Sequence, residues 1–591
     1  MCGILAITHS RTLDTKRYET ARMLETLKHR GPDGHGEYTR KNCWLGHTRL
    51  SIIDLAGGTQ PMLDGSAADE LALSFNGEIY NFRALRAELE TLGHNFVTHS
   101  DTEVILKSYR QWGTDAVAHL DGMFAFALWD AKQNQLLLAR DRFGKKPLYY
   151  AFDGDTLVAA SEIKALLASG RIEGRLSREA LDNYLRLMYI PPWKSVYENV
   201  QQIPPAHYGV FKNGKLHLMR YWRLEYHSLS ISYNDAKEEV RRLLTDAVKK
   251  RMLASDVEVG ALLSGGVDST FICLLAKNYL DHPLKTFSLG YSDYINELPF
   301  AEQAAKAIGS EHHTLQASGD MIEEFEKIIP YFDEPHADSS DFPQSLVSGL
   351  AASKVKVALS GDGGDELFLG YGWHTRHQNL SYRAHTFEKM FLDPFQGRVR
   401  ATQIFSPAER LALWSSPFPL NNDLFDDGAY EQGQTVMERI NTFDLTTYLP
   451  GQLLSKVDRT GMMHSLEVRS PFLDTALAEF VVNLPTEYKA GTNGHKLILK
   501  DLLSELMPKE FVNRRKQGFG APTTKWLREK NMSQYAQEKL GSRASVRSLL
   551  SGRIIDFYLN DFYGKQRDRA AMRLWLLLCL ELWLDTAKPR L

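Results

Sequence analysis

The sequence predicts a two-domain protein: an N-terminal α+β layered domain, followed by a C-terminal α/β domain with a parallel sheet and a helical extension. Short apolar or alternating runs dominate the first 160 or so residues. Strand and helix patterns alternate from about residue 234, and the pattern becomes mostly helical from about 382. These two patterns of predicted strands and helices distinguish a layered α+β domain from a domain built of βαβ units. We therefore expect domains over 2–211 and 236–591, joined by a linker over 212–235.

In the first domain, strand-like runs such as CGILAI and ELALSFNGEIY are bounded by turn residues. Helical spacing of apolar residues predicts helices over about 16–28 and 82–92. Proline pairs at 191–192 and 204–205 mark the exit from this domain. The run GVFKNGKLHLMRYW then predicts a hairpin with Asn213 and Gly214 at its turn.

In the second domain, the apolar runs VGALLS, KTFSLG and VKVALS are short strands between long helical patterns. This alternation predicts a parallel sheet with helices on both faces. The helical stretch 382–434 offers material that could reshape a cleft. The apolar run 574–580 is far shorter than the roughly 20 residues that a membrane span needs, so it predicts a buried helix.

Composition excludes several classes of protein. Lys and Arg number 70 against 73 Asp and Glu, so a polybasic nucleic-acid binder and a membrane partner are both disfavoured. The four cysteines show no metal-like spacing, and the N-terminus has no basic region before its apolar stretch. We expect a cytoplasmic protein that binds small charged metabolites. A homodimer is the commonest soluble assembly, although no sequence feature identifies an interface.

Cysteine at position 2 has two interpretations. Removal of Met1 would leave a thiol beside a free α-amine, whose pKa of about 7.7–8.0 lets it accept the thiol proton. The residue would then be an N-terminal nucleophile with its own base. The alternative is an inert, buried small residue.

Four polar motifs follow within the next hundred residues: HRGPDG at 29–34, LGHTRL at 45–50, FNGEIYN at 75–81 and SDTE at 100–103. Each is weak alone, since an Asn-Gly pair is usually a turn. Hydrolysis of glutamine needs an oxyanion hole, an Arg for the carboxylate and acids for the ammonium group. In this order, the four motifs resemble the class II glutamine amidotransferase domain, which has an N-terminal-nucleophile hydrolase fold, over about residues 2–165. The resemblance implies Cys2 as nucleophile, Asn76 and Gly77 as the oxyanion hole, and Arg49, Asn76, Glu78 and Asp101 as glutamine ligands.

A glycine-rich turn, SGGVDST at 264–270, lies between a short strand and a helix pattern. Backbone N–H groups and the helix dipole converge on a phosphate at such a turn. It is neither a Walker A loop nor a dinucleotide fingerprint, and a plain tight turn is the alternative. A second turn, SGDGGDE at 360–366, interleaves glycines with acids suited to Mg²⁺.

SGGVDST resembles the phosphate loop of ATP-pyrophosphatase-type adenylating enzymes. With DEPHADSS at 333–340 and SKVDRTGMMHSLEVRSPFLD at 455–474, the likeness narrows to the glutamine-hydrolysing asparagine synthetase family. It implies that Asp268 and Asp365 bind Mg²⁺ and that Lys456 stabilises transition-state charge. Asp362 stands where some members carry Glu. The ATP ligands implied are Leu263, Ser264, Gly265, Gly266, Asp268, Ser269, Leu289, Ser360 and Gly361.

The resemblance implies a ligase that adenylates the side-chain carboxylate of aspartate with ATP and aminates it with ammonia from glutamine. A close alternative keeps this chemistry but amidates another carboxylate, such as an envelope sugar, a peptide or a secondary-metabolite precursor. A more distant alternative is a non-catalytic binding protein that has kept the fold. That hypothesis predicts that Cys2, Asn76, Asp268 or Lys456 would be replaced by another residue type, and all four residues are present.

Overall fold

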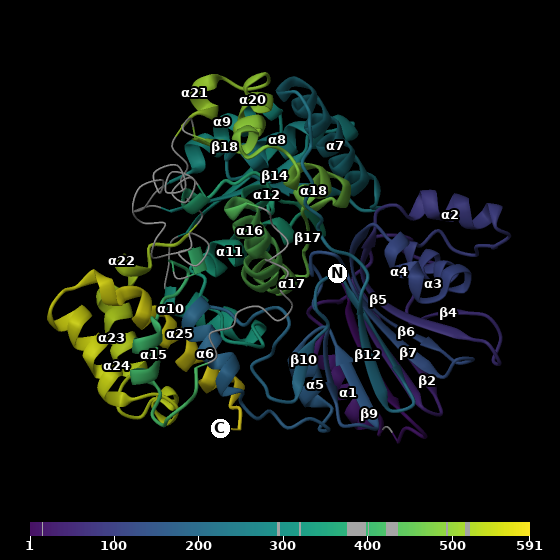
Figure 1. Cartoon of the computed structure of the whole chain (residues 1–591), viewed down its shortest axis with the longest axis horizontal. Coiled ribbons are helices and arrows are strands. Elements are labelled where there is room, and N and C mark those ends of the chain that lie inside the picture. Colours follow the sequence, from purple (N-terminus) through teal and green to yellow (C-terminus); the bar gives the residue numbers. More distant parts are fainter. Residues whose placement is uncertain are drawn as a thin grey trace.

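The computed structural model describes residues 1–14, 16–291, 296–317, 321–374, 398–399, 401–420, 435–491, 494–514 and 520–590. Figure 1 shows strands of the N-terminal domain on one side and the helix-rich remainder of the chain on the other. Within the described residues, no helix has the length and apolarity needed to cross a membrane.

The N-terminal domain contains two six-stranded antiparallel sheets. The first runs in the order β10-β8-β9-β1-β3-β2 and comprises β1 (Gly3–His9), β2 (Gly34–Arg40), β3 (Cys43–Arg49), β8 (Tyr149–Phe152), β9 (Thr156–Ala160) and β10 (Val200–Gln202). The second runs in the order β12-β11-β7-β6-β5-β4 and comprises β4 (Met62–Asp64), β5 (Leu71–Ile79), β6 (Gly122–Asp130), β7 (Gln135–Arg140), β11 (His207–Lys212) and β12 (Lys215–Arg220).

The two sheets pack face to face, because alternate apolar side chains of β1 and β3 share a core with those of β5, β6 and β7. Six helices belong to this half of the chain: α1 (Arg17–Thr26), α2 (Phe82–Thr91), α3 (Asp101–Trp112), α4 (Ala116–His119), α5 (Ile163–Ala168) and α6 (Arg178–Leu187). Helices α1 and α5 contact the first sheet, and α3 contacts the second. The predicted layered domain and its first two helices are confirmed.

The predicted hairpin at Asn213 and Gly214 is also present, with β11 and β12 paired over six residues. Strand β12 lies inside the stretch expected as linker, yet it extends the second sheet. The segment 221–232, which carries neither helix nor strand, leads from this sheet into the next domain.

The C-terminal domain is built on a five-stranded parallel sheet in the order β15-β14-β13-β16-β17. Its strands are β13 (Val259–Leu262), β14 (Lys285–Tyr291), β15 (Glu311–Ala317), β16 (Val357–Leu359) and β17 (Glu467–Arg469). The chain runs outward from β13 to β15 and then returns to place β16 on the other side of β13. Strand order therefore reverses between β13 and β16, where open α/β sheets bind their ligands.

The helices around this sheet are α7 (Tyr233–Leu253), α8 (Val267–Ala276), α9 (Leu298–Ile308), α10 (Met321–Ile328), α11 (Asp341–Ala352), α12 (Gly364–Leu367), α16 (Val436–Phe443), α17 (Leu454–Met462), α18 (Thr475–Val482), α19 (Thr486–Lys489), α20 (Leu497–Ser504) and α21 (Lys509–Val512). A π-helical segment, Asp444–Leu453, leads into α17, and a small hairpin pairs β18 (Ala490–Gly491) with β19 (Gly494–His495).

The helical extension comprises α15 (Pro407–Leu413), α22 (Thr523–Arg528), α23 (Lys530–Lys539), α24 (Gly552–Leu559) and α25 (Ala571–Ala587). Figure 1 shows α22–α25 in yellow, beside α6 and α10. The apolar run 574–580 lies inside α25 and is buried, as expected. Most of the predicted helical stretch 382–434 lies outside the described residues; α15 is in its described part.

Candidate functional site

The two sheets of the N-terminal domain bring Cys2 next to Asn76. Cys2 stands immediately before β1 and is 8% exposed, beneath a buried Met1. Its backbone N–H donates to Asn76 Oδ1 at 3.0 Å, and its Sγ lies 3.8 Å from the carbonyl oxygen of Leu50. Burial raises the pKa of the Cys2 thiol, while the N-terminal ammonium group and the backbone contact with Leu50 oppose that shift. The thiol is thus held in place but is not activated while Met1 is attached.

Asn76 is fully buried on β5, and its Nδ2 has no hydrogen-bond partner among the described residues. A buried amide donor without a partner is costly and calls for an explanation. The adjacent Gly77 has a φ of +148°, and a Cβ there would lie 2.0 Å from the carbonyl oxygen of Met123, so only glycine fits. Asn76 and Gly77 therefore place an amide donor and a side-chain-free backbone beside Cys2, as an oxyanion hole requires.

The predicted glutamine ligands have partners of their own. Glu78 Oε1 pairs with Arg469 Nη2 at 3.3 Å, while Glu78 Oε2 is buried with no hydrogen-bond partner in the described chain. Burial and then the Glu467 carboxylate hold the pKa of Glu78 well above its usual range. Asp101 Oδ2 accepts the backbone N–H of Ile79 at 3.0 Å, and burial raises the pKa of Asp101 to about 6.

Arg49 ends β3, and its guanidinium donates to the carbonyl oxygens of Asp54 at 2.7 Å and Leu55 at 3.0 Å. These bonds use part of its donor fork and fix its direction. An arginine held this way can still offer its remaining N–H groups to a carboxylate.

The second site lies at the strand-order reversal of the parallel sheet. A cavity of 910 Å³ opens there, a size typical of ligand pockets. The loop after β13 and the loop after β16 both reach it. The predicted residues that line it are Leu263, Ser264, Gly266, Asp268, Ser269, Leu289, Ser360, Gly361, Asp365 and Lys456.

Gly265 lies behind this lining. It has a φ of +71°, and a Cβ there would meet the backbone N of Ala301 and the carbonyl carbon of Phe300, each at 2.6 Å. The loop thus packs directly on the start of α9. In the loop after β16, a Cβ on Gly361 would lie 3.1 Å from the Cβ of Asp268. Glycines at these positions let the two loops and α9 approach one another closely.

The predicted Mg²⁺ ligands Asp268 and Asp365 are brought together by a lysine. Lys496 Nζ pairs with Asp268 Oδ2 and lies 2.7 Å from Asp365 Oδ1. Within the described part of the chain, no group of three or more His, Cys, Asp or Glu side chains could hold a metal. Two carboxylates suit Mg²⁺ only when phosphate oxygens complete its shell. Asp268 and Asp365 therefore fit Mg²⁺ when a bound phosphate supplies the remaining oxygen ligands.

Lys456, on α17, faces the same cavity from another side. Its Nζ donates to Ser340 Oγ at 2.7 Å and lies 3.3 Å from Asp338 Oδ2. Although burial lowers the pKa of Lys456, the neighbouring acids Asp338 and Asp362 raise it overall, so the side chain is charged. Asp362, whose role the sequence left open, accepts a hydrogen bond from Ser360 Oγ at 2.7 Å.

Two site residues escaped the sequence analysis. Lys496 directly precedes α20 with a φ of +54°. The only sequence signal for it was a lysine next to a Gly-His pair before a helix pattern. Arg469 lies in the motif at 455–474, but its contact with Glu78 crosses between the domains. Its backbone carbonyl also accepts the N–H of Ser360 at 2.8 Å, so one residue touches both candidate sites.

Comparison with known proteins places these sites in a family. The glutamine amidotransferase domain family matches residues 1–222, and the asparagine synthase family matches 239–585. "Asparagine synthetase [glutamine-hydrolyzing] 3" of Bacillus subtilis is 34% identical over 88% of this chain and 87% of the relative. "Asparagine synthetase [glutamine-hydrolyzing] 1" of the same organism is 31% identical, covering 99% and 96%. A Gibberella zeae protein named as an amidase is 28% identical, covering 89% and 90%. The chain belongs to the asparagine synthase family.

Proposed function

We propose that the chain is a glutamine-dependent asparagine synthetase, which converts aspartate to asparagine with ATP and glutamine. One observation carries the proposal: a single chain holds Cys2 against an unpaired amide donor and also holds an ATP-sized cavity lined by a glycine loop and by lysines that include Lys456 and Lys496. Neither site alone makes an amide. Together they supply ammonia and an activated carboxylate.

Removal of Met1 precedes the first reaction. The freed α-amine of Cys2 takes the thiol proton, and the thiolate attacks the amide carbon of glutamine. The oxyanion receives hydrogen bonds from Asn76 Nδ2 and the backbone N–H of Gly77. The α-ammonium returns the proton to the substrate nitrogen, ammonia leaves, and water then hydrolyses the thioester to release glutamate. Glu78 Oε2 and Asp101 are placed to accept the substrate ammonium, and Arg49 its carboxylate.

The second reaction activates the acceptor. A carboxylate oxygen of aspartate attacks the α-phosphorus of ATP, and pyrophosphate leaves. Ammonia attacks the acyl carbon, loses a proton, and expels AMP. The backbone of Ser264–Ser269 cradles phosphate, and Lys456 and Lys496 balance the charge that develops. Asp268 and Asp365 would hold Mg²⁺, which would neutralise phosphate charge.

The alternative keeps this chemistry and changes the acceptor to another carboxylate. Relatives named as amidases give it some support, at lower identity than the relatives named as asparagine synthetases. The aromatic side chains of Tyr371 and Trp373 also line the cavity, where they could contact an acceptor larger than aspartate.

The proposal includes a cytoplasmic location, a homodimer and the domain limits 2–211 and 236–591, with the first limit moved to Arg220 because β12 belongs to the second sheet. The four cysteines of the sequence are free and buried, which supports a reducing compartment. The dimer rests on the frequency of such assemblies among soluble proteins.

An acceptor screen tests the function. The protein is incubated with ATP, Mg²⁺, glutamine and one of several carboxylates, and AMP is measured. We expect AMP formation to depend on aspartate; AMP formation with another acid alone would overturn the assignment. In the same assay Cys2→Ala should abolish glutamine-dependent synthesis and keep synthesis from ammonium salts. Loss of both would refute the division into two sites.

A further inference from the structure

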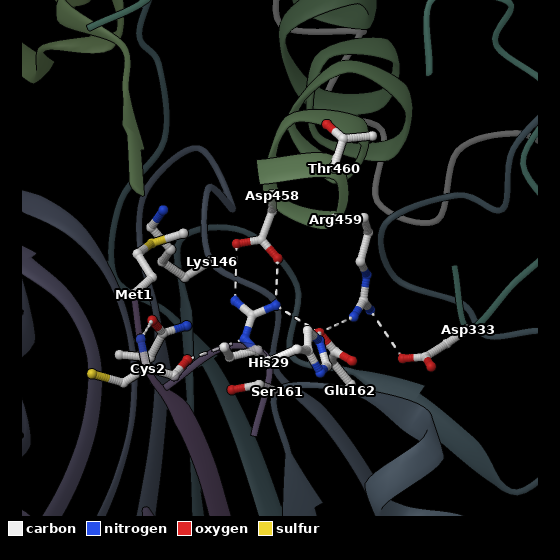
Figure 2. A network of polar contacts seen from close by, with 12 residues as sticks. Met1, Cys2, His29, Lys146, Ser161, Glu162, Asp333, Asp458, Arg459 and Thr460 are labelled. Carbon is white, nitrogen blue, oxygen red and sulfur yellow. Dashed lines mark hydrogen bonds and ion pairs between the residues drawn. The ribbon is translucent and has the colours of Figure 1, made fainter. Parts of the chain in front are cut away.

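A buried ion pair connects the nucleophile to the opposite domain. Arg30 is fully buried in the turn after α1, and its Nε donates to the carbonyl oxygen of Cys2 at 3.1 Å. Its two terminal nitrogens donate to both oxygens of Asp458, on α17, at 2.8 and 3.0 Å. Figure 2 shows Asp458 and Arg459 extending from the helix of the synthetase domain toward Cys2 and Glu162.

The pair sits inside a larger network. Glu162 accepts from Arg30 at 2.8 Å and pairs with Arg459 at 2.9 Å; Arg459 in turn lies 3.2 Å from Asp333. The synthetase domain makes a second contact with the same turn, because Ser465 Oγ donates to the carbonyl oxygen of His29 at 2.7 Å. Residues of the other domain therefore contact the turn at both His29 and Arg30.

Such a network is a poor way to gain stability, because desolvation of the charges offsets their attraction. It is a good way to fix direction. Two parallel hydrogen bonds from a carboxylate fix the plane of a guanidinium, and that plane fixes where Nε points. Cys2 is thereby held at its carbonyl by Arg30 and at its nitrogen by Asn76. Both the thiol and the α-amine produced by processing take their orientation from these contacts.

We propose that Asp458, a residue of the synthetase domain, is a positioning residue for glutamine hydrolysis, acting on Cys2 through Arg30. Asp458 touches neither substrate nor thiol. It makes the geometry of one active site depend on a helix that also carries Lys456 of the other. This inference rests on the proposed glutaminase activity of Cys2.

The experiment compares Asp458→Asn with wild type and with Asp182→Asn. Asp182 is an equally buried carboxylate that binds the buried Arg410 at 3.1 Å, but it joins α6 to α15. We expect Asp458→Asn to lower kcat for glutamine hydrolysis roughly 10- to 100-fold, the scale of a misplaced catalytic group, with little change in KM. Ammonia-dependent synthesis should stay within about threefold of wild type, and Asp182→Asn should leave both rates within the same limit.

A second variant keeps the inference falsifiable if Asp458→Asn folds poorly. Arg30→Lys retains the charge but cannot bond the Cys2 carbonyl and both Asp458 oxygens together. It should lower glutaminase kcat similarly, and adding Asp458→Asn should lower it little further. Unchanged glutaminase activity in Asp458→Asn, equal loss of both activities, or additive effects in the double variant would overturn the inference. If wild-type protein hydrolyses no glutamine, the proposed function itself fails.

Discussion

Gly265→Ala tests whether close packing, and not only glycine flexibility, shapes the phosphate loop. Gly265 has a φ of +71°, and its new Cβ would lie 2.6 Å from two backbone atoms at the start of α9. On its other side, Arg514 Nη2 donates to the Gly265 carbonyl oxygen at 2.7 Å. The loop is therefore held between two neighbours, and the added methyl group has no free direction in which to move.

The magnitude has two parts. A left-handed conformation costs a residue with a Cβ about 1–2 kcal/mol. Carbon contacts are optimal near 3.5–4.0 Å, so relief of the overlap needs a backbone shift of about 1 Å. Overpacking of this kind costs about 1–3 kcal/mol. If displacement of the loop relieves the overlap, this second part appears as weaker ATP binding, roughly 5- to 150-fold.

Gly309→Ala is the matched control. Gly309 ends α9 with a φ of +74°, and a Cβ there would meet no atom within 4 Å. Gly309→Ala therefore incurs only the free-energy cost of the left-handed conformation. The KM for ATP, measured as ammonia-dependent AMP formation, should rise in Gly265→Ala and not in Gly309→Ala, while glutamine hydrolysis stays unchanged in both. Equal KM values in the two variants would refute the packing argument.

Two further predictions concern the same cavity. Lys496→Met should lower AMP formation about 100-fold or more, because the cavity loses an ammonium group that balances the charge developing on the phosphate. Glutamine hydrolysis serves as the internal control, and an unchanged rate of AMP formation would contradict the assigned role. Glu366→Gln addresses pH. Burial, and then Asp365, raises the pKa of Glu366 to about 8 from an ordinary 4.5, so the folded protein binds the extra proton between those values. Wild-type stability from this group is therefore present at low pH and declines as pH rises from about 4.5 to about 8. The melting temperature of Glu366→Gln relative to wild type should rise across that interval; a constant difference would contradict the shifted pKa.

Much of the fold follows from local patterns. Alternating strands bounded by Asn-Gly and Gly-Pro turns predict the layered first domain, and the hairpin at Asn213 and Gly214 forms where expected. The extent of the linker does not follow from such patterns. Strand β12 is mostly exposed, as a linker would be, but its backbone pairs with β11, as the Asn-Gly turn predicts. Edge pairing of this kind leaves little trace in hydrophobic periodicity.

The candidate sites divide in the same way. Glycine-rich turns between a strand and a helix are local, so residues 264–269 could be predicted as a phosphate loop before the cavity was seen. Lys496 could not, because it reaches Asp268 across 228 residues of sequence and belongs to a segment with no motif of its own. The contact of Arg469 with Glu78 joins the two domains, and no sequence pattern within either domain predicts it.

By itself, the sequence determined the two domain types, and it predicted a nucleophile at position 2 and a phosphate loop at 264–270. These features depend on neighbours in the chain, whose turn and helix preferences act locally. Tertiary structure alone decided that Lys496 lies between the predicted magnesium ligands and that Asp458 holds Arg30 against the Cys2 carbonyl. Such contacts form when separate elements are packed together, and electrostatic pairing in a buried interface is set by that packing and not by the order of residues.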